Sequence, residues 1–155
     1  MKNEEIIHHR GKVLHSFVTV ELMINTIISM HYLKRVDSDF VIDVLNNEMS
    51  SFGFKKSILK QILNGADHES SFKKLEKLNR IRNLFAHATP ILMNVDVTKN
   101  INDERAEVWF RNPKIPGTEV DPQIKFKEYN ELFPQVCSWL NSIGRKNGIN
   151  YPESN

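Results

Sequence analysis

Three side chains near the middle of the sequence have the types and spacing that proton and phosphate chemistry requires. Arg82, Asn83 and His87 place a guanidinium, a carboxamide and an imidazole within about two turns of one predicted helix. Histidine accepts or donates a proton near neutral pH, and arginine stays charged and binds phosphate oxygens in pairs. Arg82 and His87 lie about 140° apart around an ideal helix. They converge only through the reach of arginine, a loosened helix end or a second copy of the chain.

An acidic residue in the first predicted helix is the fourth candidate. Glu21 lies on the apolar face between Phe17 and Ile24, and Arg82 lies within the apolar face of its own helix. A charge in such a position is costly unless it is paired or opened to a cleft. We therefore expect Glu21 and Arg82 either to form a structural ion pair or to share a functional polar cleft.

The elements that position these residues are predicted to be helices, because apolar residues recur at helical spacing. The expected helices cover about 4–34, a short segment with Phe40 to Leu45 capped by Ser38, about 54–63, about 69 to Thr89 and Pro90, and about 127–145. Gly65 is expected to stop the third helix. Pro134 is expected either to kink the last helix or to mark its first turn.

The pattern changes between the fourth and last helices. Segments 91–97 and 106–111 are rich in β-branched and aromatic residues, and turn-forming residues separate them, so we predict a β-hairpin or an irregular arm. Residues 112–122 contain three prolines and a glycine and are expected to form a loop. The predicted fold is all-α: a helical bundle of about five helices with this small arm before the last helix.

Composition indicates one soluble globular domain. The 155 residues are 40% hydrophobic and carry a net charge of +2, which is less basic than is typical of a non-specific nucleic-acid-coating protein. We expect a single domain over 1–148, with the arm at 91–122 inserted, and a flexible tail at 149–155.

Cellular location and cofactors can also be predicted from the residues present. The one cysteine, Cys137, excludes an intramolecular disulfide, suits a reducing cytoplasm and lies in an apolar pattern typical of a buried residue. Polar residues interrupt the apolar stretch 13–33, and the first residues lack the apolar core of a signal peptide. We therefore expect a cytoplasmic protein without a membrane span. The histidines show no established zinc spacing, and no metal or other cofactor is predicted.

The segment Arg-Asn-Leu-Phe-Ala-His at 82–87 resembles the Arg-x4-6-His motif of the HEPN superfamily. It stands near the end of a late helix, and the long first helix with its internal Glu21 is also similar to the opening helix of that superfamily. The residues of the motif further resemble those of mannitol-repressor-like members of the superfamily. The resemblance covers residues 13–90 and, by architecture, the last helix, but it does not explain the arm at 91–122.

The resemblance implies a function as well as a fold. Many HEPN proteins are metal-independent endoribonucleases, often toxins or antiviral effectors, which dimerise so that two motifs line one cleft. Carried over to this sequence, the site residues are Arg82, Asn83 and His87, with Glu21 as a polar partner. The expected partners are RNA, a second copy of the chain and an antitoxin or regulatory protein. The alternative is a non-catalytic regulatory module similar to the mannitol-repressor group, and small-nucleotide binding in the same cleft is a third reading.

Residues outside the motif are candidates for RNA contacts. Trp109 and Arg111 in the arm could stack on bases, although a Trp109 and Phe110 pair packed on the helices, or at a dimer contact, would explain the same residues. Lys73 could contact phosphate. The lysine pairs at 55–56 and 73–74 are expected first of all to be solvated.

Overall fold

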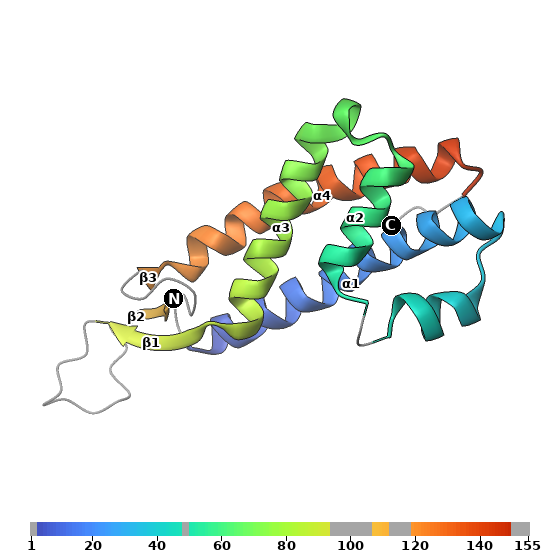
Figure 1. The fold of residues 1–155 in the computed structure, drawn as a ribbon. Coiled ribbons are helices and arrows are strands. Elements are labelled where there is room, and N and C mark those ends of the chain that lie inside the picture. The colour runs from blue at the N-terminus through green and yellow to red at the C-terminus, as the bar shows by residue number, and fades with distance from the viewer. Residues whose placement is uncertain (1–2, 48–49, 94–106, 112–118, 150–155) are drawn as a thin grey trace, which may run out of the picture. The chain divides into compact units, whose positions relative to one another are not determined.

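The computed structural model describes residues 3–47, 50–93, 107–111 and 119–149, and most of them are helical (Figure 1). In chain order the elements are α1 (Asn3–Leu33), the π-helix η1 (Phe40–Leu45), α2 (Phe52–Ile62), the 3-10 helix η2 (Gly65–His68), α3 (Glu69–His87), β1 (Thr89–Met93), β2 (Glu107–Arg111), β3 (Glu119–Val120) and α4 (Pro122–Lys146). The expected all-α helical bundle with a small β arm before its last helix is thus confirmed.

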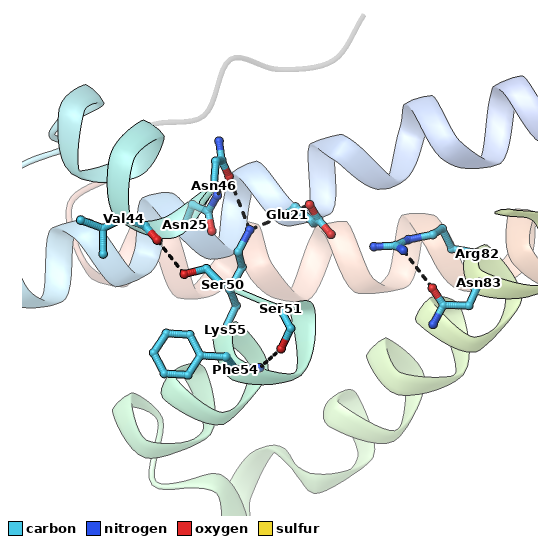
Figure 2. A network of polar contacts seen from close by, with 10 residues as sticks. All are labelled: Glu21, Asn25, Val44, Asn46, Ser50, Ser51, Phe54, Lys55, Arg82 and Asn83. Atoms are coloured by element: carbon cyan, nitrogen blue, oxygen red, sulfur yellow. Dashed lines mark hydrogen bonds and ion pairs between the residues drawn. The ribbon is translucent and has the colours of Figure 1, made fainter. Parts of the chain in front are cut away.

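The helix ends follow from local capping, which the sequence predicted only in part. The expected cap at Ser38 is wrong, because Asp37 Oδ1 accepts the hydrogen bond from the Phe40 backbone N–H, at 3.0 Å. Ser51 caps α2 by accepting from the Phe54 N–H at 3.2 Å, as Figure 2 shows. After α2 the left-handed residue is Asn64, with φ of 48°, so Gly65 begins η2 and is not the stop that we expected.

The predicted β-hairpin is present and has a third strand. β1 and β2 are antiparallel, with Thr89 opposite Arg111 and Ile91 opposite Trp109. β1 is an edge strand that starts directly after α3, where Pro90, which lacks an N–H, is tolerated. The expected loop at 112–122 is wrong at its end, because Glu119–Val120 pairs with β2 as β3. The predicted turn between the segments lies outside the described residues.

The last helix begins earlier than its periodicity predicted. α4 starts at Pro122, and Asp121 Oδ1 accepts from the Gln123 N–H at 2.8 Å. Aspartate before a first-turn proline is a favoured way to begin a helix. Pro134 lies inside α4, so the reading that it marks the first turn is wrong.

The chain forms two compact units, and each of the helices α1, α3 and α4 contributes residues to both of them. Unit 1 comprises Met1–Phe17 and Glu76–Phe133, and unit 2 comprises Val18–Leu75 and Pro134–Asn155. The predicted single domain over 1–148 stays a prediction, and of the predicted tail only Ile149 falls within the described residues.

Aromatic residues fill the core of unit 1. The Phe85 ring of α3 packs edge-on against the Phe110 ring of β2, with centroids 5.1 Å apart, and both side chains are fully buried. The Tyr129 hydroxyl of α4 donates to the Val13 carbonyl of α1 at 3.2 Å. The end of α3 therefore rests on the sheet and lies in the same core as α1 and α4.

Unit 2 has its own apolar core. Its fully buried side chains include Ile24, Ile27, Ile28, Leu45, Leu59, Leu75 and Leu140. Trp139 of α4 packs edge-on against Phe72 of α3 at 5.1 Å, and its indole N–H donates to His68 Nδ1 at 3.3 Å. This hydrogen bond satisfies the polar end of a large, half-buried ring.

Helix α1 contains a stretch that is long enough and apolar enough to cross a membrane. The stretch is Glu4–Leu33, and 56% of its most apolar window is buried within the protein. Apolar core helices, which other elements cover, and signal sequences meet the same two criteria, so this property alone does not indicate a membrane span.

Glu128 provides a pH-dependent contact within unit 1. Its carboxylate accepts from Lys125 at 2.7 Å and from Lys77 of α3 at 2.5 Å, and these hydrogen bonds lower its pKa below the ordinary 4.5. A lowered pKa stabilises the fold above the unfolded value, and that stability is lost as pH falls through the folded pKa. Glu128→Gln should cost up to about 1 kcal/mol of unfolding free energy at pH 7.

Chemical denaturation of wild type and Glu128→Gln at pH 7 and at pH 3 measures this difference. We expect the gap between the two proteins to shrink as the pH is lowered from 4.5, because the wild-type carboxylate then becomes protonated. A gap that is the same at both pH values would show that the two lysines do not stabilise the charged form.

Candidate functional site

Arg82 is held against an aromatic ring of α1. Its guanidinium carbon lies 4.6 Å from the centre of the Phe17 ring. Its Nη1 donates to Asn83 Oδ1 at 2.8 Å (Figure 2). Phe17 is 2% exposed, whereas Arg82 is only half-buried. A cation over a buried ring is fixed in position while part of it stays in contact with water. Asn83 therefore orients the guanidinium within unit 1.

His87 is the last residue of α3, and its side chain is exposed. The backbone is α-helical throughout 82–87, so a loosened helix end does not bring His87 towards Arg82. The reach of arginine and a second copy of the chain remain as ways to bring the two side chains to one substrate. An exposed imidazole at the end of a helix is accessible to a large substrate such as a polymer.

A residue that sequence reasoning missed fixes this end of α3. Arg10 of α1 donates from Nε to the Phe85 carbonyl at 2.6 Å and from Nη2 to the Ala88 carbonyl at 2.5 Å. Its guanidinium also lies 5.5 Å from the centre of the Phe110 ring. The last carbonyls of a helix have no partner within the helix, and a positive charge there is favourable. Arg10 thus clamps the backbone on both sides of His87.

Glu21 belongs to unit 2, where it lies beside a lysine. Its Oε2 is 4.0 Å from Lys55 Nζ. The expectation that the lysine pair at 55–56 is solvated is wrong for Lys55, whose side chain is only 4% exposed. Arg82 belongs to unit 1, and the predicted pairing of Glu21 with Arg82 stays a prediction.

The proposed RNA-contacting residues are at or near the surface. Trp109 is half-buried and Arg111 is exposed, whereas Phe110 between them is fully buried, as strand alternation requires. Phe110 therefore packs in the core as the alternative reading expected, and Trp109 and Arg111 lie on the other face of β2. Lys73 is exposed and pairs with Glu69 at 2.8 Å, which raises the pKa of the lysine. Contact of these residues with RNA stays a prediction.

Other chemistries have less support among the described residues. Burial raises the pKa of the Cys137 thiol to about 11, so the thiolate is scarce at neutral pH. Within the described residues, no three histidine, cysteine or acidic side chains are grouped so that they could hold a metal ion. Arg82 and His87, in the last two turns of α3, are of the types suited to phosphate binding and to proton transfer.

No family model, curated protein or solved structure matches this chain. The resemblance of residues 82–87 to the HEPN motif therefore stays a prediction, and the function is inferred from the site.

Proposed function

We propose that the protein is a metal-independent endoribonuclease of the HEPN type, with Arg82 and His87 as catalytic residues. The observation that supports this most directly is the contrast between the two side chains. Arg82 is anchored by Phe17 and Asn83, whereas His87 is exposed at a helix end that Arg10 holds in place. A site that stabilises phosphate charge and moves protons needs a fixed cation and an accessible imidazole.

RNA provides the nucleophile for this reaction. The 2′-hydroxyl attacks the neighbouring phosphorus, and the bond to the 5′-oxygen of the next nucleotide breaks. One imidazole removes the 2′ proton, and a protonated imidazole gives a proton to the departing 5′-oxygen. The guanidinium of Arg82 binds the charge that develops on the phosphate oxygens. The products are a 2′,3′-cyclic phosphate and a 5′-hydroxyl.

A second copy of the chain would supply the second imidazole. One His87 cannot be base and acid at the same moment, so a homodimer with two motifs at one cleft suits the chemistry. A toxin or host-defence effector is the biological role that we propose for such an enzyme. Its cognate partner would be an antitoxin or another regulatory protein.

Incubation of the purified protein with mixed RNAs in EDTA tests the proposal. We expect cleavage in the presence of the chelator, because no step needs a metal ion, with 2′,3′-cyclic phosphate and 5′-hydroxyl ends identified by end-labelling and mass spectrometry. Absence of cleavage, or 5′-phosphate products, would count against this function. Absence of cleavage would favour the regulatory module instead, in which Arg82 serves to hold helices together.

A further inference from the structure

A row of three polar residues crosses the sheet of unit 1. Thr89 of β1 lies opposite Arg111 of β2, and Arg111 in turn lies opposite Glu119 of β3. All three residues are exposed, whereas Phe110, the neighbour of Arg111 in β2, is fully buried. Side chains alternate between the two faces of a strand, so the row lies on the face that points away from the core.

Thr89 and Arg111 carry hydrogen-bond donors that are available to a ligand. Among the described residues, neither side chain forms a hydrogen bond or an ion pair. Residues directly opposite each other in an antiparallel pair have Cβ atoms about 4.5–5.5 Å apart. At this separation the hydroxyl and the guanidinium can donate to oxygens of the same phosphate, which arginine binds with two N–H groups.

This pair of donors lies close to His87, the proposed acid–base group. Thr89 follows His87 by two residues, so the Cα atoms of these residues are at most about 7 Å apart. The Cα atom of Arg111 is about 5 Å from that of Thr89 across the strand pair. All three residues belong to unit 1. An RNA strand with one phosphate at His87 therefore brings its next phosphate within reach of Thr89 and Arg111.

Glu119 lies on the other side of Arg111 and carries the opposite charge. The two residues are register partners, but no ion pair joins their side chains. Exposed ion pairs are weak, because both charges are already solvated. The carboxylate therefore leaves the guanidinium available to a ligand, although its negative charge lowers the affinity for a phosphate placed beside Arg111.

We propose that Thr89 and Arg111 bind the phosphate adjacent to the one that is cleaved. The inference rests on the proposed ribonuclease function, which identifies the cleaved phosphate as the one at His87. The preferred substrate is then an RNA with at least two consecutive phosphates, because a dinucleotide with a single internucleotide phosphate lacks one of the two contacts. Arg111 is a positioning residue, since it holds the strand in register while Arg82 and His87 act on the scissile phosphate.

Calorimetric titration of the full chain with a 2′-O-methyl trinucleotide tests the proposal without cleavage, because this ligand lacks the attacking hydroxyl. It is compared with two trinucleotides in which one or the other internucleotide linkage is a neutral methylphosphonate. Wild type should bind the fully charged strand about tenfold tighter than either neutralised strand. In Arg111→Ala this affinity gain should disappear, since only one phosphate site remains. Equal binding of all three strands by wild type, or an undiminished gain in Arg111→Ala, would overturn the proposal.

Matched variants separate a local contact from an effect of net charge. Arg145→Ala removes the same charge from an exposed position of α4 in unit 2 and should keep the affinity gain; its loss there too would contradict the assignment. Thr89→Val, which removes the hydroxyl, should weaken binding of the charged strand by about threefold, and Glu119→Gln should strengthen it by a similar factor. Cleavage of unmodified RNA is measured separately: its absence would count against the proposed function, whereas the affinity differences decide the phosphate site.

Discussion

Replacing His87 by alanine is expected to abolish RNA cleavage and to leave the fold intact. Loss of a general acid–base group typically costs about 100-fold to 10,000-fold in rate. The side chain is exposed, so the free energy of unfolding should change by less than about 0.5 kcal/mol. Initial cleavage rates and denaturant unfolding of wild type and His87→Ala measure the two quantities.

His15 provides the matched control, because it is also an exposed histidine in unit 1 and lies outside the motif. His15→Ala should cleave at the wild-type rate. Arg82→Ala should lose cleavage as His87→Ala does, because the charge on the phosphate is no longer stabilised. Undiminished cleavage in both His87→Ala and Arg82→Ala would refute the site.

Replacing Arg10 by alanine is expected to give a large loss of stability, although the residue is outside the motif. Two charge-assisted hydrogen bonds to the Phe85 and Ala88 carbonyls and the contact with Phe110 are lost, which should cost about 2–3 kcal/mol of unfolding free energy. Denaturant unfolding measures the loss. Faster amide exchange in the last turn of α3 should accompany it, and cleavage should fall because His87 is no longer held.

Arg80→Ala is the control for this substitution. Arg80 is an exposed arginine of α3 that donates a hydrogen bond to Glu76 Oε1 at 3.1 Å, and such surface i,i+4 pairs contribute at most about 0.5 kcal/mol. If Arg10→Ala were as stable as Arg80→Ala, the hydrogen bonds of Arg10 would not be what fixes the end of α3.

The helix that carries the motif could be predicted from the sequence, because the signals that determine its course and its end are local. The apolar period of α3 and the break at Thr89 and Pro90 both lie within a few residues of His87. The start of α4 was missed although Asp121 and Pro122 signal it, because the apolar period becomes regular only later. The two-residue strand β3 has too few residues to show any alternation.

The parts of the site that could not be predicted depend on contacts between distant segments. Periodicity places Lys55 on a helix but not in a buried position, since that depends on the packing of α2 against α1 within unit 2. The role of Arg10 is likewise invisible along the sequence, where it is one of 21 basic residues. The end of a helix indicates that its last carbonyls need hydrogen-bond donors, but it does not indicate which residue supplies them.

The two hydrogen bonds of Arg10 join positions 75 and 78 residues apart. Closing a loop of that length has an entropic cost that must be met before such a contact forms, so this contact is expected to appear late in folding. The histidine would reach its working position only once the opening helix has docked. Loss of the first ten residues to a protease would then abolish the proposed ribonuclease activity, although every motif residue would still be in the chain.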